Sequence, residues 1–487
     1  MKTVLNTVKD VAAYFKNNPN QYRYHFVSPS NFNLMDLHRW VSNWQHIGFL
    51  DNYDKTNPYS VVPDYQVNVL LDSIEAINLF LLRQKSVQSL LKPKDKIMCL
   101  FFSEEIEAEC RKQNLQLMLS SQAIMRHIDN KIETTKIGNR VGISSVPNVL
   151  TAVKSYQQLC ELADQHKLGR DWVIQTAFGD SGKTTYFISN EAAFNEIAAE
   201  LKQEEQIKLM KRIRCQGTAI EACATRWGTF VGPLMLELIG APALTPYAGG
   251  WSGNELHRQA APTSVSDQAA SMTQKLGDEL YRLGYRGYFE VDYLIDLDTN
   301  EVFLGEINPR ISGVTTLTTT TELSQQELPL FLFHLLEYDD NVELNLSANE
   351  FNQLVKQAGY QGVNAQLIAK HTSETLQIVS QAPVSGVYRL NDKSELVLIK
   401  RAHERLAATQ PGEAFLLRIL KEGSYAYQGA DLAIVFVNEP VMFGQSQLNN
   451  QGDRWASAIN QAFVRRDLTA EEAAWATRYS PDGNKMA

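Results

Sequence analysis

The stretch from Gly284 to Gly313, GYRGYFEVDYLIDLDTNEVFLGEINPRISG, constrains the fold more than any other part of the sequence. Apolar and aromatic residues are interleaved with acids over 287–295, and the turn-forming sequence DLDTN follows at 296–300. Residues 301–306 are then mostly apolar again. This pattern predicts a β-hairpin with two half-buried strands.

The predicted hairpin carries candidate metal ligands. Asp292 lies on its first strand and Glu306 near the end of its second, and acids on paired strands can project to the same side. Asn308 adds an amide oxygen, which completes an all-oxygen set of the kind that suits Mg²⁺. Arg310 follows, and its planar guanidinium can bind a phosphate or a carboxylate. The alternative is a solvated acidic surface, but these acids lie within apolar strands.

The segment 306–310, EINPR, resembles the metal-binding motif of the ATP-grasp ligases, and biotin carboxylase and carbamoyl phosphate synthetase carry similar E-x-N-x-R loops. The resemblance implies that Asp292, Glu306 and Asn308 hold Mg²⁺ or Mn²⁺ ions. It also implies that Arg310 faces the reacting phosphate.

The identity of the first metal ligand stays open between two acids. Asp292 lies fourteen positions before the Glu of the motif, a spacing that favours it. Glu290 has the same strand phase, and the F-E-F sequence of biotin carboxylase resembles Phe289–Glu290 here.

Length and composition limit the class of protein. A chain of 487 residues suggests about three domains. A net charge of −9 provides no basic face for nucleic acid. The five cysteines form no C-x-x-C motif, which indicates reduced thiols in a cytoplasmic protein. The N-terminal sequence MKTVLNTVKD lacks an apolar h-region, and no apolar run approaches the roughly 20 residues of a membrane span, so we expect no signal peptide and no membrane partner.

The fold class expected is a multidomain α/β and α+β protein. Strand and helix alternation over 1–122 predicts an open α/β domain. The resemblance implies a two-lobed ATP-grasp domain at 123–344. Short apolar stretches separated by turns predict a small β-rich domain at 345–466, and residues 467–487 are expected to form a mobile tail.

The entry to the ATP-grasp domain has a recognisable pattern. Asp129 and Lys131 form a D-x-K sequence that precedes a predicted helix, and Gly142 to Pro147 reads GISSVP. This order resembles that of the family, and it implies that Lys131 contacts a phosphate of ATP.

Residues 171–189, DWVIQTAFGDSGKTTYFIS, predict two strands around a glycine-rich loop. A P-loop is excluded because Ala177 stands where its first glycine belongs and a strand follows in place of a helix. A hairpin flap over the phosphates fits better, which is the ATP-grasp arrangement. The candidate phosphate contacts are Ser181, Gly182 and Lys183, with Lys183 also a candidate catalytic residue.

Gln175 is the one clear departure from the family pattern in this region. Many members have a lysine on the incoming strand at this position. Because glutamine supplies no charge, either Lys183 takes over that role or the nucleotide is bound more weakly.

The link between the two lobes is expected to pass the adenine base. The resemblance places Lys211, Arg212 and Ile213 near the base, and Glu221 near the ribose or a metal ion. Two further segments keep alternative interpretations: 249–254, GGWSGN, predicts a loop that either lines the acceptor pocket or only connects strands, and 315–321, TTLTTTT, either contacts substrate or forms a strand.

The resemblance implies an ATP-dependent ligase with small-molecule partners. Such an enzyme joins a carboxylate, here an amino acid or another small acid, to an amine through an acyl phosphate, and releases ADP and phosphate. One alternative is a bicarbonate-activating enzyme like biotin carboxylase. Another is a non-catalytic nucleotide-binding protein, for which Gln175 is the argument. Homodimer formation is left open.

Overall fold

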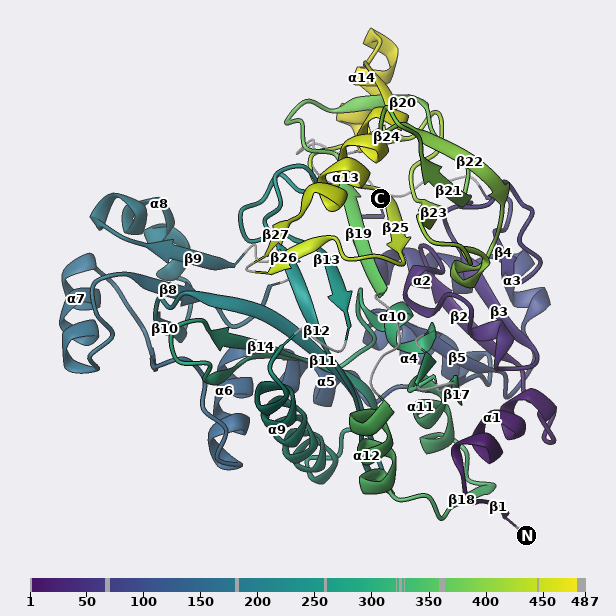
Figure 1. Ribbon diagram of the computed structural model, residues 1–487, viewed down its shortest axis with the longest axis horizontal. Helices are drawn as coiled ribbons and strands as arrows, with labels where there is room; N and C mark the ends of the chain where they lie inside the picture. Colours follow the sequence, from purple (N-terminus) through teal and green to yellow (C-terminus); the bar gives the residue numbers. More distant parts are fainter. Residues whose placement is uncertain are drawn as a thin grey trace.

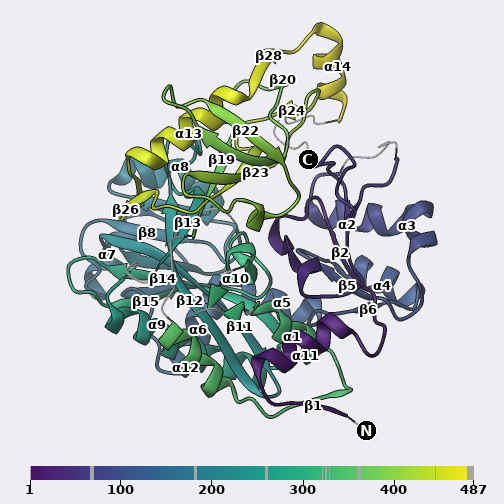
Figure 2. The ribbon, with the colours of Figure 1, turned by 45° about the vertical axis from the view of Figure 1, so that its right-hand side comes forward.

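The computed structural model describes residues 2–65, 71–179, 184–257, 261–320, 322–323, 326–327, 329–358, 364–444 and 446–479. Its N-terminal region holds a five-stranded sheet made of β2 (Tyr24–Ser28), β3 (Trp44–Gly48), β4 (Ser60–Val61), β5 (Lys96–Cys99) and β6 (Gln116–Leu117). All pairs are parallel, in the order β4-β3-β2-β5-β6. Helices accompany the sheet (Figure 2): α2 (Ile74–Arg83), α3 (Lys85–Leu90) and α4 (Glu104–Lys112). The predicted open α/β layer is therefore confirmed.

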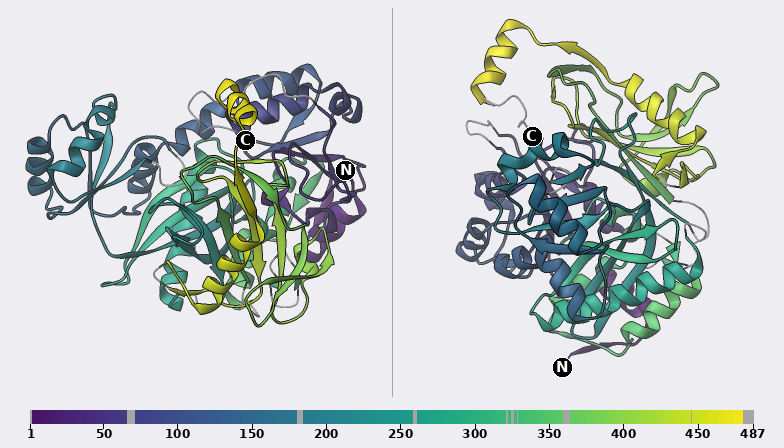
Figure 3. Two further views of the ribbon diagram at one scale, coloured as in Figure 1. Left: turned by 90° about the horizontal axis from the view of Figure 1, so that it is seen from above. Right: turned by 90° about the vertical axis from the view of Figure 1, so that its left-hand side faces the viewer.

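A small lobe projects from the rest of the molecule (Figures 1 and 3). Its antiparallel sheet consists of β7 (Asn148–Thr151), β8 (Trp172–Gln175), β9 (Thr185–Ile188) and β10 (Ile207–Lys211), in the order β7-β10-β8-β9. Helices α7 (Tyr156–Gln165) and α8 (Glu191–Leu201) share a hydrophobic core with one face of this sheet. The chain enters the lobe through α5 (Gln122–Asp129) and α6 (Lys131–Arg140).

The second lobe is built on a ten-stranded antiparallel sheet. Its strands are β11 (Cys215–Thr225), β12 (Gly228–Ile239), β13 (Trp251–Leu256), β14 (Gly287–Asp296), β15 (Val302–Asn308), β19 (Asn364–Lys370), β21 (Gly386–Leu390), β22 (Leu396–Arg401), β23 (Glu413–Arg418) and β25 (Asp431–Val437). They follow the order β15-β14-β11-β12-β13-β19-β25-β23-β21-β22. The predicted hairpin is thus present as β14 and β15, at one edge of the sheet.

Several helices pack on this large sheet. The helix α9 (Thr263–Arg282) lies against β11 and β12, and α12 (Ala348–Ala358) lies against β12. The short helix α11 (Phe331–Glu337) packs on β11 and β14. The N-terminal segment is tied to the same region, because β1 (Thr3–Leu5), followed by α1 (Val8–Asn17), pairs in parallel with β18 (Val342–Leu344).

The large sheet runs without a break across the predicted boundary between residues 344 and 345, because β13 pairs with β19. The loop predicted at 249–254 is wrong in its second half, where β13 begins. Gly253 has a φ of 150°, and a Cβ there would lie 2.1 Å from the carbonyl oxygen of Gln366. This glycine therefore permits close approach of two strands, and its presence does not mark a flexible loop.

The remaining elements lie mostly in the C-terminal region. A three-stranded sheet is formed by β20 (Gln377–Gln381), β24 (Tyr425–Ala426) and β28 (Val464–Asp467). Two short hairpins are β16 (Glu322–Leu323) with β17 (Gln326–Glu327) and β26 (Met442–Gly444) with β27 (Gln447–Leu448). The helices are α13 (Asn450–Ala462) and α14 (Ala470–Tyr479).

The segment expected to be a mobile tail contains the helix α14, which projects from the C-terminal region in Figure 2. Thr469 and Glu472 start it with a reciprocal pair of bonds: the Thr469 hydroxyl accepts from the Glu472 amide at 3.3 Å, and the Glu472 carboxylate accepts from the Thr469 amide at 2.8 Å. This is a capping box, and the sequence TAEE carries its signature. Residues 480–487 lie outside the described residues.

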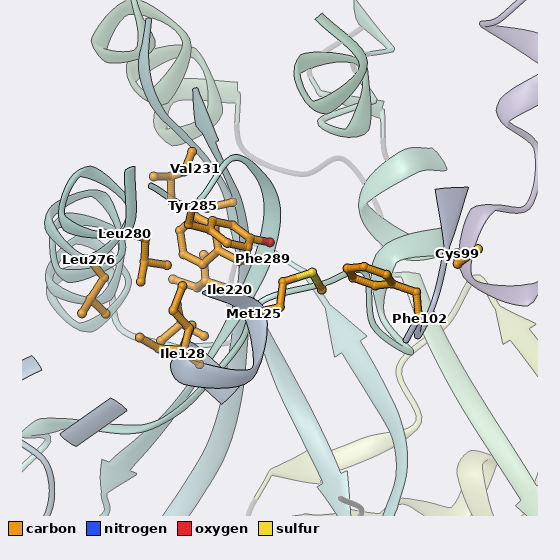
Figure 4. Packing of buried hydrophobic residues seen from close by; sticks show 14 of the residues in the cluster. Cys99, Phe102, Met125, Ile128, Ile220, Val231, Leu276, Leu280, Tyr285 and Phe289 are labelled. Atoms are coloured by element: carbon orange, nitrogen blue, oxygen red, sulfur yellow. The ribbon is translucent and has the colours of Figure 1, made fainter. Parts of the chain in front are cut away.

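One hydrophobic core joins the N-terminal domain to the large sheet. It contains Phe102 next to the parallel sheet, Met125 of α5, Phe289 of β14 and Leu276 of α9. In Figure 4 Met125 points toward Phe102, between the two groups of side chains. The N-terminal domain is therefore fixed to the large sheet rather than linked by a flexible connection. Within the described part of the chain, no helix is long and apolar enough to span a membrane.

Candidate active site

The edge hairpin of the large sheet presents its acids in register. Asp292 lies opposite Glu306, and Glu290 lies opposite Asn308. The side-chain amide of Asn308 donates to Asp292 Oδ2 at 3.2 Å and to Glu290 Oε2 at 3.3 Å. Two carboxylates therefore meet at one amide group, and the register sets Asp292, not Glu290, beside Glu306.

Burial strongly affects the protonation of these acids. It raises the pKa of Asp292 to about 6, although the charges of Lys131 and Arg310 oppose the shift. Burial and the negative charge of Asp292 raise the pKa of Glu290 well above its usual range. An added positive charge would therefore stabilise the ionised form of this pair.

A further carboxylate, Glu237 of β12, lies beside this group and was not predicted from the sequence. Gly217 faces it on β11, and a Cβ at Gly217 would lie 2.8 Å from Glu237 Oε2, so the glycine makes room for the carboxylate. Burial and the charge of Asp292 raise the pKa of Glu237 well above its usual range. The pairing of a glycine with an acid on neighbouring strands could not be recognised without the register.

Two cations lie next to the acids. Lys131 is the first residue of α6, and its ammonium forms an ion pair with Glu306. Arg310 donates to Asn308 Oδ1 at 2.9 Å, and its guanidinium lies 4.7 Å from the centroid of the Phe101 ring. The buried Nε of Arg310 has no hydrogen-bond partner among the described residues.

Lys131, Glu306, Asn308 and Arg310 line a pocket of about 220 Å³, whereas Asp292 and Glu290 lie outside its lining. The pocket is lined by residues from the hairpin and the loop after it, from the N-terminal domain and α6, and from the flap: Glu306, Ile307, Asn308, Arg310, Phe101, Asp129, Lys131 and Gly179. Four of the predicted site residues, Lys131, Glu306, Asn308 and Arg310, are therefore brought together at one cavity.

The predicted flap is present as the hairpin of β8 and β9. The backbone amide of Lys131 donates to the carbonyl of Ala177 at 2.8 Å, which attaches α6 to the flap. The Gln175 amide donates to Thr185 Oγ1 at 3.3 Å. The predicted phosphate contacts at the tip, Ser181, Gly182 and Lys183, lie outside the described residues.

The segment predicted to pass the base lies where the two lobes meet. Met210 packs with Val146 and Phe303 in a small apolar cluster, and Ile213 lies against it. By contrast Lys211 is exposed. Arg212 forms an ion pair with Asp171 at 3.2 Å. The apolar cluster offers a surface of the kind that a flat aromatic base contacts.

Glu221 lies apart from the pocket lining, in the interior of the large sheet. Its carboxylate accepts hydroxyl hydrogen bonds from Tyr288 at 2.7 Å and from Ser312 at 3.1 Å, as well as from Thr315 and Thr318. The threonines belong to the helix α10 (Thr315–Thr320), so the strand alternative for this segment is wrong. The helix places the hydroxyls of Thr315 and Thr318, which are about one turn apart, on the same side, where both donate to Glu221.

The donor set of the hairpin fits a hard divalent cation. Asp292 Oδ1 is buried and has no hydrogen-bond partner among the described residues. Glu306 and Asn308 add oxygens from the neighbouring strand. Over the described ranges, no three Asp, Glu, His or Cys side chains form a complete metal cage. Mg²⁺ does not require one, since it usually keeps water and substrate phosphates as ligands.

No protein-family model matches this sequence, and no curated protein is detectably similar to it in sequence. Solved structures do resemble it in fold. The biotin carboxylase domain of the 2-oxoglutarate carboxylase from Hydrogenobacter thermophilus, in complex with MgADP, ADP and bicarbonate, is 11% identical with a TM-score of 0.56, and the match covers 86% of each chain.

Two further structures give the same result. The N5-carboxyaminoimidazole synthase from Aspergillus clavatus, in complex with ADP and 5-aminoimidazole ribonucleotide, is 12% identical over 91% of this chain and 99% of that chain, with a TM-score of 0.52. A biotin carboxylase from Campylobacter jejuni, in a β-γ-ATP complex, is 11% identical over 96% and 92%, with a TM-score of 0.54. The chain therefore has the ATP-grasp fold, as its EINPR segment indicated.

Proposed function

We propose that this protein is an ATP-dependent ligase that joins a small carboxylate to an amine and releases ADP and phosphate. The observation that carries the proposal is the pocket that receives Lys131 from α6, Glu306 and Asn308 from β15, and Arg310 from the loop after β15. This cavity can admit a small acid. It is lined by cationic side chains that can bind phosphate and by oxygen atoms that can bind a divalent ion. The fold supports the same proposal, since solved structures with this fold contain ATP or ADP.

Each residue of the site has a task in this reaction. A substrate carboxylate oxygen attacks the γ-phosphorus of ATP, and the bond from this phosphorus to the β–γ bridging oxygen breaks. The products of this step are an acyl phosphate and ADP. Arg310 faces the transferred phosphoryl group and stabilises its charge. Lys131 binds phosphate oxygens, and the flap excludes water that would hydrolyse the acyl phosphate. The amine then attacks the acyl carbon and releases phosphate.

Asp292, Glu306 and Asn308 are the residues that would hold Mg²⁺. When bound there, the ion would neutralise charge on the phosphoryl oxygens. The partly unsatisfied Asp292 carboxylate is the observation that supports this assignment. Glu290 remains beside it as a second acid that contacts the same amide.

The substrates are proposed to be small molecules, and the location to be cytoplasmic. All five cysteines are free thiols, as expected in a reducing compartment. An amino acid or another small acid is our proposal for the carboxylate. We keep a homodimer as a proposal for the assembly.

The test is a screen for ADP release by the full chain with MgCl₂, ATP and pooled carboxylates and amines. A productive pair should give ADP release that depends on both substrates. Hydroxylamine should trap the acyl phosphate as a hydroxamate when the amine is omitted. Nucleotide binding without turnover for any pair would favour a non-catalytic protein, and absence of nucleotide binding would exclude the ligase proposal.

Bicarbonate is a second candidate for the carboxylate substrate, because one structure with this fold contains bicarbonate and ADP. The same screen separates the two candidates when it includes labelled bicarbonate with biotin or with 5-aminoimidazole ribonucleotide as acceptor. Fixation of label would identify a carboxylase. Amide formation without bicarbonate would identify a carboxylate–amine ligase.

A further inference from the structure

Lys208 of β10 occupies a position that the sequence pattern did not assign. In the antiparallel pairing of β10 with β8 it lies directly opposite Gln175. Residues that face each other across such a pair project to the same side of the sheet. Gln175 is the position at which many ATP-grasp proteins have a lysine, so a lysine is present here on the neighbouring strand.

The side to which Lys208 projects is the side of the active site. Its neighbour Leu209 belongs to the core under the helices α7 and α8. Met210 packs with Phe303 of the opposite lobe. Because alternate residues of a strand share a face, Lys208 and Met210 both face the large sheet and its hairpin.

The side chain of Lys208 is almost fully buried, and no opposite charge acts on it among the described residues. The residue is 1% exposed and forms no hydrogen bond or ion pair with any described residue. Burial, reinforced by the positive charge of Lys131, lowers the pKa of Lys208 to about 7. The ammonium groups of Lys208 and Lys131 therefore repel each other. Lys131 has a carboxylate partner, Glu306.

Another buried lysine shows what a structural role looks like in this chain. Lys96 of β5 is also 1% exposed. Its ammonium donates to the carbonyl of Tyr338 at 2.9 Å and lies 4.1 Å from the centroid of the Tyr22 ring. Lys96 is therefore satisfied within the protein. A buried ammonium without such partners is costly, and the binding of an anion would remove the cost.

We propose that Lys208 binds the phosphate oxygens of the nucleotide and takes the place of the lysine that is missing at Gln175. The proposal rests on the proposed function, because it assumes that a nucleoside di- or triphosphate enters this site. Neighbouring strands are only about 4.8 Å apart, and four methylene groups let a lysine span that distance. The phosphate site would thus keep a positive charge, supplied by a lysine on β10 instead of one on β8.

The experiment compares Lys208→Met with the wild type and with Lys154→Met, an exposed lysine of the same lobe. Affinities for ADP with Mg²⁺ and for adenosine are measured by equilibrium titration of the full chain. Lys208→Met should bind ADP roughly tenfold or more weakly, since a charge-assisted hydrogen bond is lost. Adenosine affinity should stay within about twofold, because adenosine has no phosphate, and Lys154→Met should match the wild type for both ligands.

A rescue variant tests the placement directly. In Gln175→Lys/Lys208→Met the ammonium returns to the neighbouring strand and should recover most of the lost ADP affinity. Failure of this double variant to recover ADP affinity, when Lys208→Met alone is weakened, would contradict the idea that the two positions serve one phosphate site. An equal loss of ADP and adenosine affinity in Lys208→Met would also contradict it.

Thermal unfolding provides a second measurement that does not need a ligand. Replacing an unpaired buried ammonium by an apolar side chain of similar size should leave the melting temperature unchanged or raise it. Lys96→Met should lower it, since Tyr338 loses its donor. A strongly lowered melting temperature or an unfolded Lys208→Met would assign Lys208 a structural role and overturn the proposal.

The outcomes separate this inference from the proposed function. If the wild type does not bind ADP with Mg²⁺, the ligase proposal and this inference both fail. If the wild type binds ADP and Lys208→Met binds it equally well, only the role of Lys208 is excluded.

Discussion

Two regions in and around the large sheet differ in how their buried charged groups are hydrogen-bonded. In the first, the carboxylate of Glu221 is fully buried and receives hydroxyl groups from Tyr288, Ser312, Thr315 and Thr318. Burial still raises the pKa of Glu221 to about 7, but the protein itself supplies the hydrogen-bond donors around it.

The second region is the cleft between the lobes, where the protein leaves charged groups incomplete. Asp292 Oδ1 and Arg310 Nε are buried without hydrogen-bond partners among the described residues. Lys208 likewise has no opposite charge acting on it among the described residues. Buried polar atoms without partners also occur elsewhere among the described residues, for example His25 Nδ1 and Arg418 Nε. In this cleft, however, such groups of opposite charge lie beside a pocket, which indicates where a charged ligand belongs. The difference separates structural burial of charge from functional burial.

The largest effect is expected for Glu306→Gln. The glutamine still accepts a hydrogen bond from Lys131 but provides no negative charge for a divalent ion. Substrate-dependent ADP release should fall by about 10³-fold or more, while the protein stays folded. Glu301→Gln, at an exposed acid in the turn between β14 and β15, is the control and should keep full activity. Normal turnover in Glu306→Gln would place the active site elsewhere.

The next effect is on stability and concerns Glu221→Ala. Removal of the carboxylate leaves several buried hydroxyl groups without an acceptor, so stability should fall by about 3 kcal/mol. The midpoint of urea unfolding measures this change, with the exposed Glu196→Ala of α8 as a control that should shift little. ADP affinity of the folded variant should change less than about threefold, as expected for a group outside the pocket. A selective loss of nucleotide binding would instead support the ribose or metal role that the resemblance implied.

The sequence predicted those parts of the molecule that depend on local pattern. The edge hairpin, the flap strands and the α/β alternation of the N-terminal domain follow from spacing and turn residues within short windows. Asp292, Glu306, Asn308 and Arg310 could be singled out because they lie within a few residues of one turn or loop.

Features that depend on register or on distant contacts could not be predicted. Lys208 becomes conspicuous only when it is known to lie opposite Gln175. Glu237 needs the glycine on the next strand, and the threonines after residue 314 need a buried carboxylate as their partner. Each of these features depends on strand pairing or on a side-chain contact between segments far apart in the sequence, and no local pattern reports such contacts.

A smaller loss of activity is expected for Arg310→Ala. The guanidinium acts on charge that develops during phosphoryl transfer, so turnover should fall about 10²-fold while ADP affinity changes by less than about fivefold. Arg282→Ala removes an exposed arginine that pairs with Glu279 on α9, and it should leave both quantities unchanged. Equal losses in turnover and ADP affinity for Arg310→Ala would indicate that Arg310 only binds the nucleotide.

The smallest predicted effect is the pH dependence of folding stability that arises from Lys208, a residue of the second region. The pKa of Lys208 is about 7 in the folded protein and has an ordinary value of 10.5. Between these two values the unfolded chain holds a proton that the folded chain has lost, so stability rises with pH through this window. The rise is limited to about 1.4 kcal/mol per pH unit for one group. Lys208→Met lacks this contribution, so its melting temperature should exceed that of the wild type most at pH 7 and less at pH 9.

The nucleotide should remove this pH dependence. A phosphate beside Lys208 favours the charged ammonium and raises its folded pKa toward the unfolded value, so less proton release accompanies folding. The difference in melting temperature between Lys208→Met and wild type should therefore vary less with pH when saturating ADP and Mg²⁺ are present. A difference that is constant from pH 7 to pH 9 without nucleotide would mean that Lys208 stays charged in the free protein. The cleft would then already stabilise the charged form of Lys208 without a ligand, as the hydroxyl groups around Glu221 stabilise its carboxylate. The difference between the two regions would therefore not include Lys208.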